Sequence, residues 1–262
     1  MRVGIVGMGQ MGAAIAARFV THGVEVLTLT GGRSSFSVAR RQAAGAIETD
    51  LFGLAACDFI FSILPSDTAV PFSESIVPAL NAVSRKGVFV ECNPLSPTKV
   101  RHLEAQITSA GWAFVDAAII GAPPLNPSSS IIFLTSGPHS ERVQSLESFG
   151  FNLRDIGGKP GDASALKLLL SGLTKGFLTL ANAVFASAEG RRVSSTLESL
   201  FEEAAPELWR TYVAGRSRLH TNRARWSSEL SELHEFLREL DPKTEIYSDL
   251  ACDLQDRTER EG

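Results

Sequence analysis

The chain has 262 residues, of which 44% are hydrophobic, and a formal net charge of −4. This length has room for one large domain or two modest ones, and the charge gives no reason to expect nucleic acid or an anionic membrane as a partner. The three cysteines show no C-x-x-C spacing, which is typical of a reducing cytosol. The first residues read as a core strand and not as a signal peptide. We expect no stretch long and apolar enough to cross a membrane and predict a cytoplasmic protein.

A glycine fingerprint opens the chain. Residues 3–12 read VGIVGMGQMG, an apolar strand that runs into Gly7-x-Gly9-x-x-Gly12. Gly7 permits a tight turn, Gly9 lets phosphates approach the backbone, and Gly12 lets a helix pack closely on the strand. A second strand at 24–29 completes a β-α-β unit, which favours a dinucleotide site over an incidental glycine-rich turn. The predicted cofactor contacts in this turn are Gly7, Gly9, Gln10, Met11 and Gly12.

The segment after the second strand indicates which nucleotide is bound. An NAD site usually has an acidic residue there that binds the ribose hydroxyl, yet residues 26–47 contain no Asp or Glu. The segment instead offers Gly32, Arg33 and Ser34, and arginine and serine bind a 2′-phosphate by charge-assisted hydrogen bonds. We therefore predict NADP(H) in preference to NAD(H). Arg40 and Arg41 either assist or form a solvated helix face.

Strand-like and helical segments alternate over roughly the first 155 residues. Apolar runs at 59–65, 87–93, 112–116 and 130–135 are separated by helical stretches such as 96–110. This alternation predicts an α/β fold with a doubly wound, mostly parallel Rossmann-type sheet covered on both faces. Right-handed crossovers place the strand exits at one edge, where we expect the cofactor.

The pattern changes after the glycine-rich segment 157–161. Residues 162–189 are continuously helix-compatible and apolar around most of the circumference, which predicts a helix buried on several sides. Amphipathic helices are predicted at 195–201, 206–214, 216–240 and 244–254. We predict an NADP-binding domain at 1–157, and a long interdomain helix with an all-α domain at 158–262. Because that helical domain is small for a core of its own, we predict a homodimer formed through it.

Lys167 is the first candidate for chemistry. It lies within an apolar helical run, and Ser171 and Thr174 follow on the same helix face. Desolvation lowers the pKa of a lysine and suits it to proton transfer near neutral pH. The alternative is a lysine whose ammonium reaches solvent at a domain surface.

Two further motifs carry a resemblance to a known family. Residues 116–121 read DAAIIG and residues 161–167 read GDASALK. With the fingerprint and the strand that ends at Pro65, they resemble the β-hydroxyacid dehydrogenase family, relatives of 6-phosphogluconate dehydrogenase and 3-hydroxyisobutyrate dehydrogenase. The resemblance spans nearly the whole chain and is closest to a branch of phosphogluconate-dehydrogenase-like oxidoreductases with a short helical C-terminal domain. It implies that Lys167 is the catalytic acid/base and that Leu64, Pro65 and Asn93 border the nicotinamide.

The substrate segment departs from the family pattern. Ala118 stands where the family has Pro, Ile120 where it has Ser, and Ser171 where it has Asn. The resemblance still implies that Ile120, Gly121 and Ser171 contact the substrate. The departures argue against the usual short 3-hydroxy acids.

A His/Arg cluster lies near the C-terminus, where His220 and Arg223 are spaced to converge on one helix face. They could bind an anionic group of the substrate. The alternative is a solvated face of arginines that pairs with Glu229 and Glu232. The histidines are dispersed without zinc-site spacing, so we predict no metal.

The combined prediction is an NADP(H)-dependent oxidoreductase that transfers hydride between nicotinamide and a small hydroxy acid or its oxo form, with Lys167 as acid/base. One alternative is an imine reductase, because such enzymes share this architecture. The other is a regulatory protein that binds the nucleotide without turnover.

Overall fold

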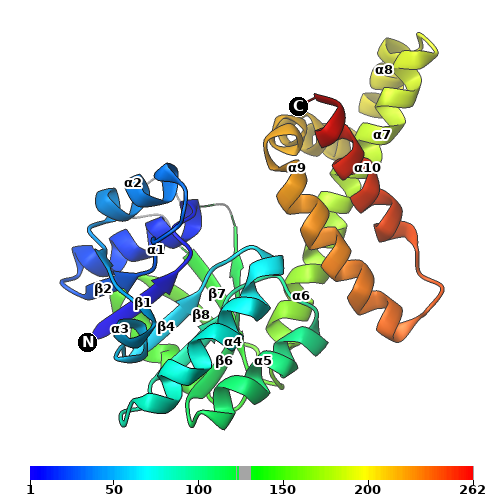
Figure 1. Ribbon diagram of the computed structural model, residues 1–262. Helices are drawn as coiled ribbons and strands as arrows, with labels where there is room; N and C mark the ends of the chain where they lie inside the picture. The colour runs from blue at the N-terminus through cyan, green and yellow to red at the C-terminus, as the bar shows by residue number, and fades with distance from the viewer. Residues whose placement is uncertain (122, 124–130, 262) are drawn as a thin grey trace. The chain divides into compact units, whose positions relative to one another are not determined.

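The computed structural model describes residues 1–121, 123 and 131–261, with the side chains of 256–261 excepted. The chain divides into two compact units, Met1–Lys167 and Leu168–Gly262. Figure 1 shows the first unit as a sheet with helices on its faces, and the second as a group of helices.

An eight-stranded sheet forms the centre of the first unit, in the order β3-β2-β1-β4-β5-β6-β7-β8. Neighbouring strands run parallel except for β6 and β7, which are antiparallel. The strands are β1 (Arg2–Val6), β2 (Glu25–Thr28), β3 (Ile47–Glu48), β4 (Phe59–Ser62), β5 (Val88–Glu91), β6 (Ala113–Ile120), β7 (Ile131–Ser136) and β8 (Phe151–Asp155).

Helices cover both faces of this sheet. One apolar core lies on the side of α1 and η1, and the other lies on the side of α4 and α5. Successive strand residues enter opposite cores because side chains alternate across a strand. The doubly wound Rossmann-type fold is therefore confirmed. The helices are α1 (Gln10–Thr21), α2 (Ser35–Ala44), α3 (Leu51–Ala55), α4 (Ser66–Ala82), α5 (Pro97–Ser109) and the 3-10 helix η1 (Ser140–Phe149).

Three strand features differ from the expectation. The short β3 was not predicted, nor was β8, because its side chains Asn152 and Arg154 break the apolar run. Strand β6 continues beyond Asp116 to Ile120, since its antiparallel pairing with β7 extends that far.

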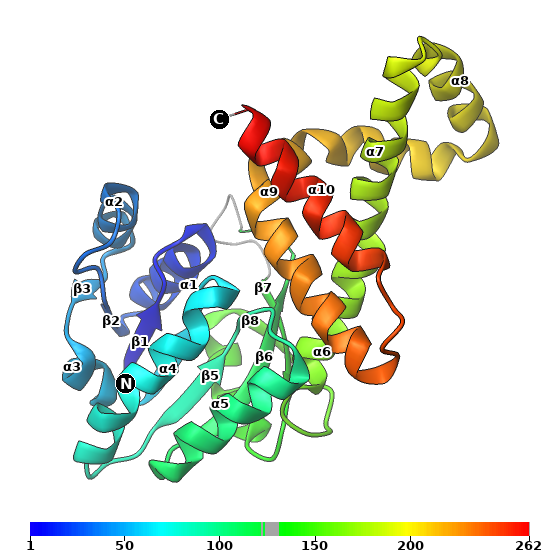
Figure 2. The same ribbon diagram turned by 45° about the vertical axis from the view of Figure 1, so that its right-hand side comes forward.

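The second unit is helical. It begins within helix α6 (Asp162–Ser171), whose residues up to Lys167 belong to the first unit. The π-helical turn η2 (Gly172–Gly176), α7 (Phe177–Gly190), α8 (Ser194–Ala204), α9 (Pro206–Leu240) and α10 (Ile246–Glu261) follow. Its core draws on α7, α9 and α10, and Figure 2 shows α10 alongside α9.

Helix α9 is continuous, so the predicted break at Gly215 is wrong. A Cβ at Gly215 would lie 2.6 Å from the side chain of Leu178. This glycine therefore permits close packing of α9 on α7 and does not end the helix.

The single chain buries the long helix on part of its circumference, whereas burial on several sides was expected. Its apolar residues Leu166, Leu173, Leu180 and Val184 are exposed by 45%, 73%, 49% and 49%. By length and composition alone residues 162–190 could cross a membrane, contrary to the expectation. Leu168, Leu178 and Phe185 of the same stretch lie in the core of the second unit.

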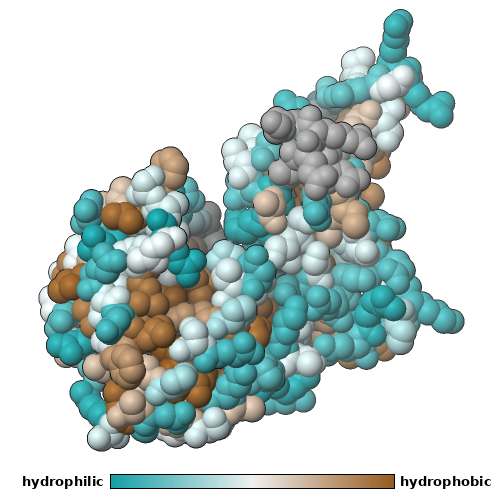
Figure 3. Space-filling view, viewed as in Figure 1, coloured by the Kyte–Doolittle hydropathy of each residue, from teal (hydrophilic) through white to brown (hydrophobic). Residues whose placement is uncertain are grey.

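The space-filling view of Figure 3 shows an apolar, brown area on the visible face of the first unit.

Candidate functional site

The glycine turn between β1 and α1 has the geometry that a pyrophosphate site needs. Gly7 has a φ of +105°, and a Cβ there would collide with the carbonyl oxygen of Ile63. A Cβ at Gly12 would collide with the carbonyl oxygen of Gly7, whereas the space beside Gly9 is open within 4 Å. Gly9 is the N-cap of α1 and offers no side chain to the first amides of the helix. Those amides, at Gln10 and Met11, are placed to donate to phosphate oxygens.

The turn after β2 presents Arg33. Its backbone N–H closes the turn on Thr30 O at 3.0 Å, and its side chain is exposed, without an ion pair among the residues that the structure describes. Ser34 caps α2 through Ser37 N at 3.3 Å, so its hydroxyl is already engaged. Gly32 precedes them with a φ of +72°.

An acidic residue that the sequence analysis missed lies near this turn. Glu48, at the end of β3, has Oε1 3.9 Å from the Cβ position of Gly31. Arg41 pairs with Glu48 at 3.8 Å, so Arg41 is not simply part of a solvated helix face. The pairing of β2 with β3 brings Glu48 to the turn after β2. A strand of two residues leaves little pattern in the sequence, so β3 and its Glu48 were not predicted.

A row of buried polar side chains crosses four neighbouring strands, at the last residues of β4, β5 and β7 and within β6. Ser62, Glu91, Asp116 and Ser136 stand opposite one another in the register of β4, β5, β6 and β7, and each has an exposure of 0%. This polar row lies at the carboxyl edge of the parallel strands, where α/β proteins of this kind bind their ligands.

Asn93 joins the loops that leave β4 and β5. Its Oδ1 accepts the Leu64 N–H at 2.5 Å, and its Nδ2 donates to Ser62 Oγ at 2.9 Å. Its own N–H donates to Glu91 Oε1 at 2.9 Å. The structure therefore brings together Asn93, Leu64 and the adjoining Pro65, the three residues that the resemblance assigns to the border of the nicotinamide.

Glu91 is a buried carboxyl group that the sequence analysis did not identify. Its pKa is raised to about 8, chiefly by burial and also by the charge of Asp116, while hydrogen bonds from Asn93 and Ser62 oppose the rise. Its Oε2 has no hydrogen-bond partner in the described part of the chain. Glu91 is therefore largely protonated near neutral pH.

Lys167 lies within the electrostatic reach of this edge. Burial raises the pKa of the Cys92 thiol, the charges of Glu91 and Asp116 raise it further, and the ammonium of Lys167 lowers it. Lys167 itself is half-buried on α6. Ile120 is half-buried at the end of β6, and Gly121 follows it, exposed, with a φ of +106°.

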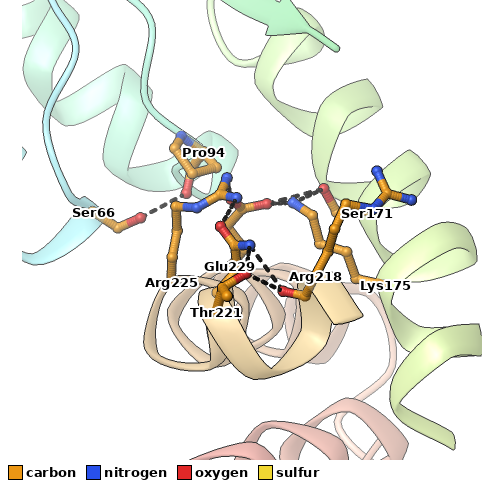
Figure 4. Close-up of polar contacts among 9 residues, drawn as sticks. Ser66, Pro94, Ser171, Lys175, Arg218, Thr221, Arg225 and Glu229 are labelled. Carbon is orange, nitrogen blue, oxygen red and sulfur yellow. Dashed lines mark hydrogen bonds and ion pairs between the residues drawn. The ribbon is translucent and has the colours of Figure 1, made fainter. Parts of the chain in front are cut away.

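Ser171 belongs to a polar cluster within the second unit (Figure 4). Its hydroxyl donates to Glu229 Oε2 at 3.3 Å and accepts from Lys175 Nζ at 3.2 Å. Lys175 and Arg225 both form ion pairs with Glu229, whose side chain is 4% exposed. Lys175 and Glu229 were missed as partners, because Ser171 and Glu229 stand 58 positions apart.

The predicted polar stripe on this helix stops at Ser171. Thr174 is exposed and donates to Leu170 O at 2.8 Å, so it does not share the buried face of Ser171. The reason is the π-helical turn at 172–176, which widens the helix and shifts the later residues around it.

His220 and Arg223 converge as expected, with His220 Nδ1 2.6 Å from a guanidinium nitrogen of Arg223. Arg223 is only 6% exposed, so the solvated-face alternative is wrong for this residue. For Arg225 one part of that alternative is observed, namely the ion pair with Glu229. Among the described residues no group of His, Cys, Asp or Glu could hold a metal ion.

Comparison with known proteins gives a family match in the first unit. Residues 2–150 match the model of the NAD binding domain of 6-phosphogluconate dehydrogenase. A 28.5 kDa uncharacterized protein of Methanothermus fervidus is 29% identical over 90% of this chain and 91% of its own length. An NADPH-dependent reductive aminase of Aspergillus oryzae is 28% identical over 79% of this chain and 70% of its own.

The similarity to solved structures extends over the whole chain. A conserved protein of unknown function, described as structurally similar to 3-hydroxyacid dehydrogenases, matches with a TM-score of 0.74 at 26% identity. The match covers 98% of this chain and 96% of that protein.

Proposed function

The chain belongs to the family with the NAD binding domain of 6-phosphogluconate dehydrogenase and is an NAD(P)-binding oxidoreductase. From this we propose that it is an NADP(H)-dependent enzyme acting on a small, anionic hydroxy acid or its oxo form. The observation that carries the proposal is the carboxyl edge of one sheet. The glycine turn, the hydrogen bonds by which Asn93 joins the loops after β4 and β5, and the charge of Lys167 all belong to the first unit.

The proposed chemistry divides between the cofactor and the chain. A bound nicotinamide supplies or accepts the hydride. Lys167 gives a proton to the carbonyl oxygen during reduction and takes it back during oxidation. Backbone near Ile120 and Gly121 orients the substrate. Ser171 could act on a substrate only as a hydrogen-bond acceptor, because its one proton is directed to Glu229.

Replacement of Lys167 by Met tests the proton transfer. We expect turnover to fall by about 10²-fold or more, the usual contribution of a positioned acid/base, while NADPH affinity stays nearly unchanged. Steady-state kinetics and calorimetric titration give the two quantities. Turnover within a few-fold of the original would remove Lys167 from the mechanism.

The preference for NADP(H) rests on charge at the β2 turn. Arg33 is exposed and available for a 2′-phosphate, while the nearby carboxylate of Glu48 is engaged by Arg41. We expect NADPH to bind at least about tenfold, or 1.4 kcal/mol, more tightly than NADH.

The variant Arg33→Ala should weaken NADPH binding and leave NADH binding nearly unchanged, because only NADPH has the 2′-phosphate. Calorimetric titration of both nucleotides measures this difference. Equal affinities of the original protein for the two nucleotides would contradict the assignment, and failure to bind either would favour a role without turnover.

We also propose a division of roles along the chain. Residues 1–157 hold the nucleotide, and residues 158–262 contribute substrate contacts and join two copies in a homodimer. His220 and Arg223 are the proposed ligands of an anionic substrate group, and a cytoplasmic location fits the three free cysteines. Arg223→Leu should raise the KM for acidic substrates selectively, and an unchanged KM would remove this role.

Reduction of a C=N bond is the second candidate function. It is favoured by the 28% identity to the Aspergillus oryzae NADPH-dependent reductive aminase. A panel of oxo acids and ketones, each tested with and without an amine, separates the two. NADPH oxidation that requires the amine would replace C–O by C–N chemistry.

A further inference from the structure

The start of α6 is held by a side chain from the middle of the sheet. Asp116 Oδ2 accepts the N–H of Gly161 at 2.9 Å and that of Ser164 at 3.1 Å. Asp116 Oδ1 accepts the hydroxyl of Ser164 at 2.6 Å. A carboxylate at this end of a helix also interacts favourably with the helix dipole.

A second strand adds to the same contact. Ser136 Oγ, on β7, donates to Asp116 Oδ2 at 2.9 Å and accepts the N–H of Ala163 at 3.1 Å. The amides of Ala163 and Ser164 in the first turn of α6 are therefore satisfied by side chains of β7 and β6. We call Asp116, Ser136 and Ser164 the Asp116 clamp.

The backbone at the clamp has little freedom. Gly161 has a φ of +105°, and a Cβ there would lie 3.1 Å from Cα and Cβ of Pro97, the first residue of α5. Asp116 has an exposure of 0%, so each of its four hydrogen bonds forms away from water, where a lost bond is costly.

Lys167 follows Ser164 by three residues, which is about one helical turn. A rotation or shift of the first turn of α6 would therefore move the ammonium of Lys167 with it. Misplacement of a catalytic group by about 1 Å can reduce turnover by about 10²-fold.

We propose that Asp116 is a positioning residue that holds the first turn of α6 and thereby places Lys167 at the carboxyl edge of the sheet. The carboxylate of Asp116 is occupied by protein donors, so Asp116 does not contact the substrate. Asp116 is nevertheless the first residue of the segment 116–121, which the family resemblance assigns to substrate binding. The inference rests on the proposed role of Lys167 in proton transfer.

Two variants loosen the clamp to different degrees. Ser164→Ala removes the bond to Oδ1 and keeps the charge and the backbone bonds. Asp116→Asn replaces an oxygen that faces several donors by an NH2 group. The control is Ser140→Ala, which removes a similar bond between Ser140 Oγ, on η1, and Asp155 Oδ2, at the end of β8, at 2.7 Å.

We expect kcat to fall several-fold in Ser164→Ala and at least about tenfold in Asp116→Asn, with the calorimetric Kd for NADPH within twofold of the original. Ser140→Ala should leave kcat unchanged. Thermal unfolding shows whether each variant is folded, and Ser164→Ala keeps the test valid if Asp116→Asn does not fold.

A second readout does not depend on turnover. The rate of acetylation of Lys167, measured across pH by peptide mass spectrometry, should change in both clamp variants relative to the control. An unchanged labelling profile of Lys167 together with an unchanged kcat in folded Ser164→Ala would overturn the proposal. If Lys167→Met keeps turnover, the catalytic role of the lysine fails, while the labelling profile still tests the clamp.

Discussion

At the scale of single residues, the neighbouring carboxyl groups of Asp116 and Glu91 at the carboxyl edge differ in how their negative charge is stabilised. Asp116 receives four hydrogen bonds, whereas Glu91 is fully buried and its Oε2 has no hydrogen-bond partner among the described residues. Two adjacent carboxylates cannot both ionise without repulsion. Burial raises the pKa of Asp116 too, but its hydrogen bonds from Ser164, Ser136 and Gly161 oppose that rise, whereas the pKa of Glu91 is raised to about 8.

Glu91 should make the stability of the protein depend on pH. Its pKa is about 8 in the folded chain and about 4.3 in an unfolded one. The unfolded state therefore loses a proton that the folded state keeps, and stability falls as pH rises through this window, by at most about 1.4 kcal/mol per pH unit. Glu91→Gln should lose this part of the slope, because glutamine stays neutral. Urea unfolding of both proteins at about pH 6 and pH 8 measures the difference, and parallel slopes would show that Glu91 ionises normally.

At the scale of elements, the turn between β1 and α1 combines two kinds of glycine. Gly7 and Gly12 are required by the fold, because a Cβ on either would strike backbone oxygen. Gly9 has ordinary backbone angles, with a φ of −69°, and open space beside it. No close contact in the fold requires this third glycine, and the proposed pyrophosphate would occupy the open space beside it.

Gly9→Ala should therefore separate folding from binding. We expect stability to change by no more than about 1 kcal/mol, because alanine restricts the unfolded chain but is a poorer N-cap than glycine. NADPH affinity should fall strongly, since the new methyl group occupies the space of the phosphates. Gly190→Ala is the matched control, because its Cβ also meets nothing within 4 Å and it lies at the end of α7. Calorimetry and thermal unfolding give both quantities, and full NADPH affinity in Gly9→Ala would place the pyrophosphate elsewhere.

At the scale of the whole molecule, α6, η2 and α7 leave a series of large apolar side chains exposed. Leu166, Leu169, Leu170 and Leu173 are exposed by 43% to 73%. Contiguous exposed apolar surface marks interaction sites, and the proposed homodimer would cover it.

Leu173→Asp should convert the proposed dimer to a monomer. Leu173 is 73% exposed in the single chain, so a charge there costs little within the monomer and would be buried in the dimer. Phe36→Asp is the control, because Phe36 is 72% exposed but lies on α2. Light scattering at micromolar concentration gives the mass of each variant, and a monomeric mass for the original protein would refute the homodimer.

The sequence by itself determined the Rossmann-type sheet, the glycine turn and the helical second half. These features depend on local patterns: alternating strands and helices, and glycines at positions where a side chain would collide. The sequence also indicated that His220 and Arg223 converge, because helical spacing alone brings such pairs together.

Only the tertiary structure decided which distant polar residues meet. The register of four strands aligns Ser62, Glu91, Asp116 and Ser136, and helix packing brings Glu229 to Ser171 and Lys175. The continuity of α9 through Gly215 and the exposure of Leu173 depend in the same way on neighbours far along the chain. Pairing register and helix packing join residues of large sequence separation, so short-range patterns do not contain this information.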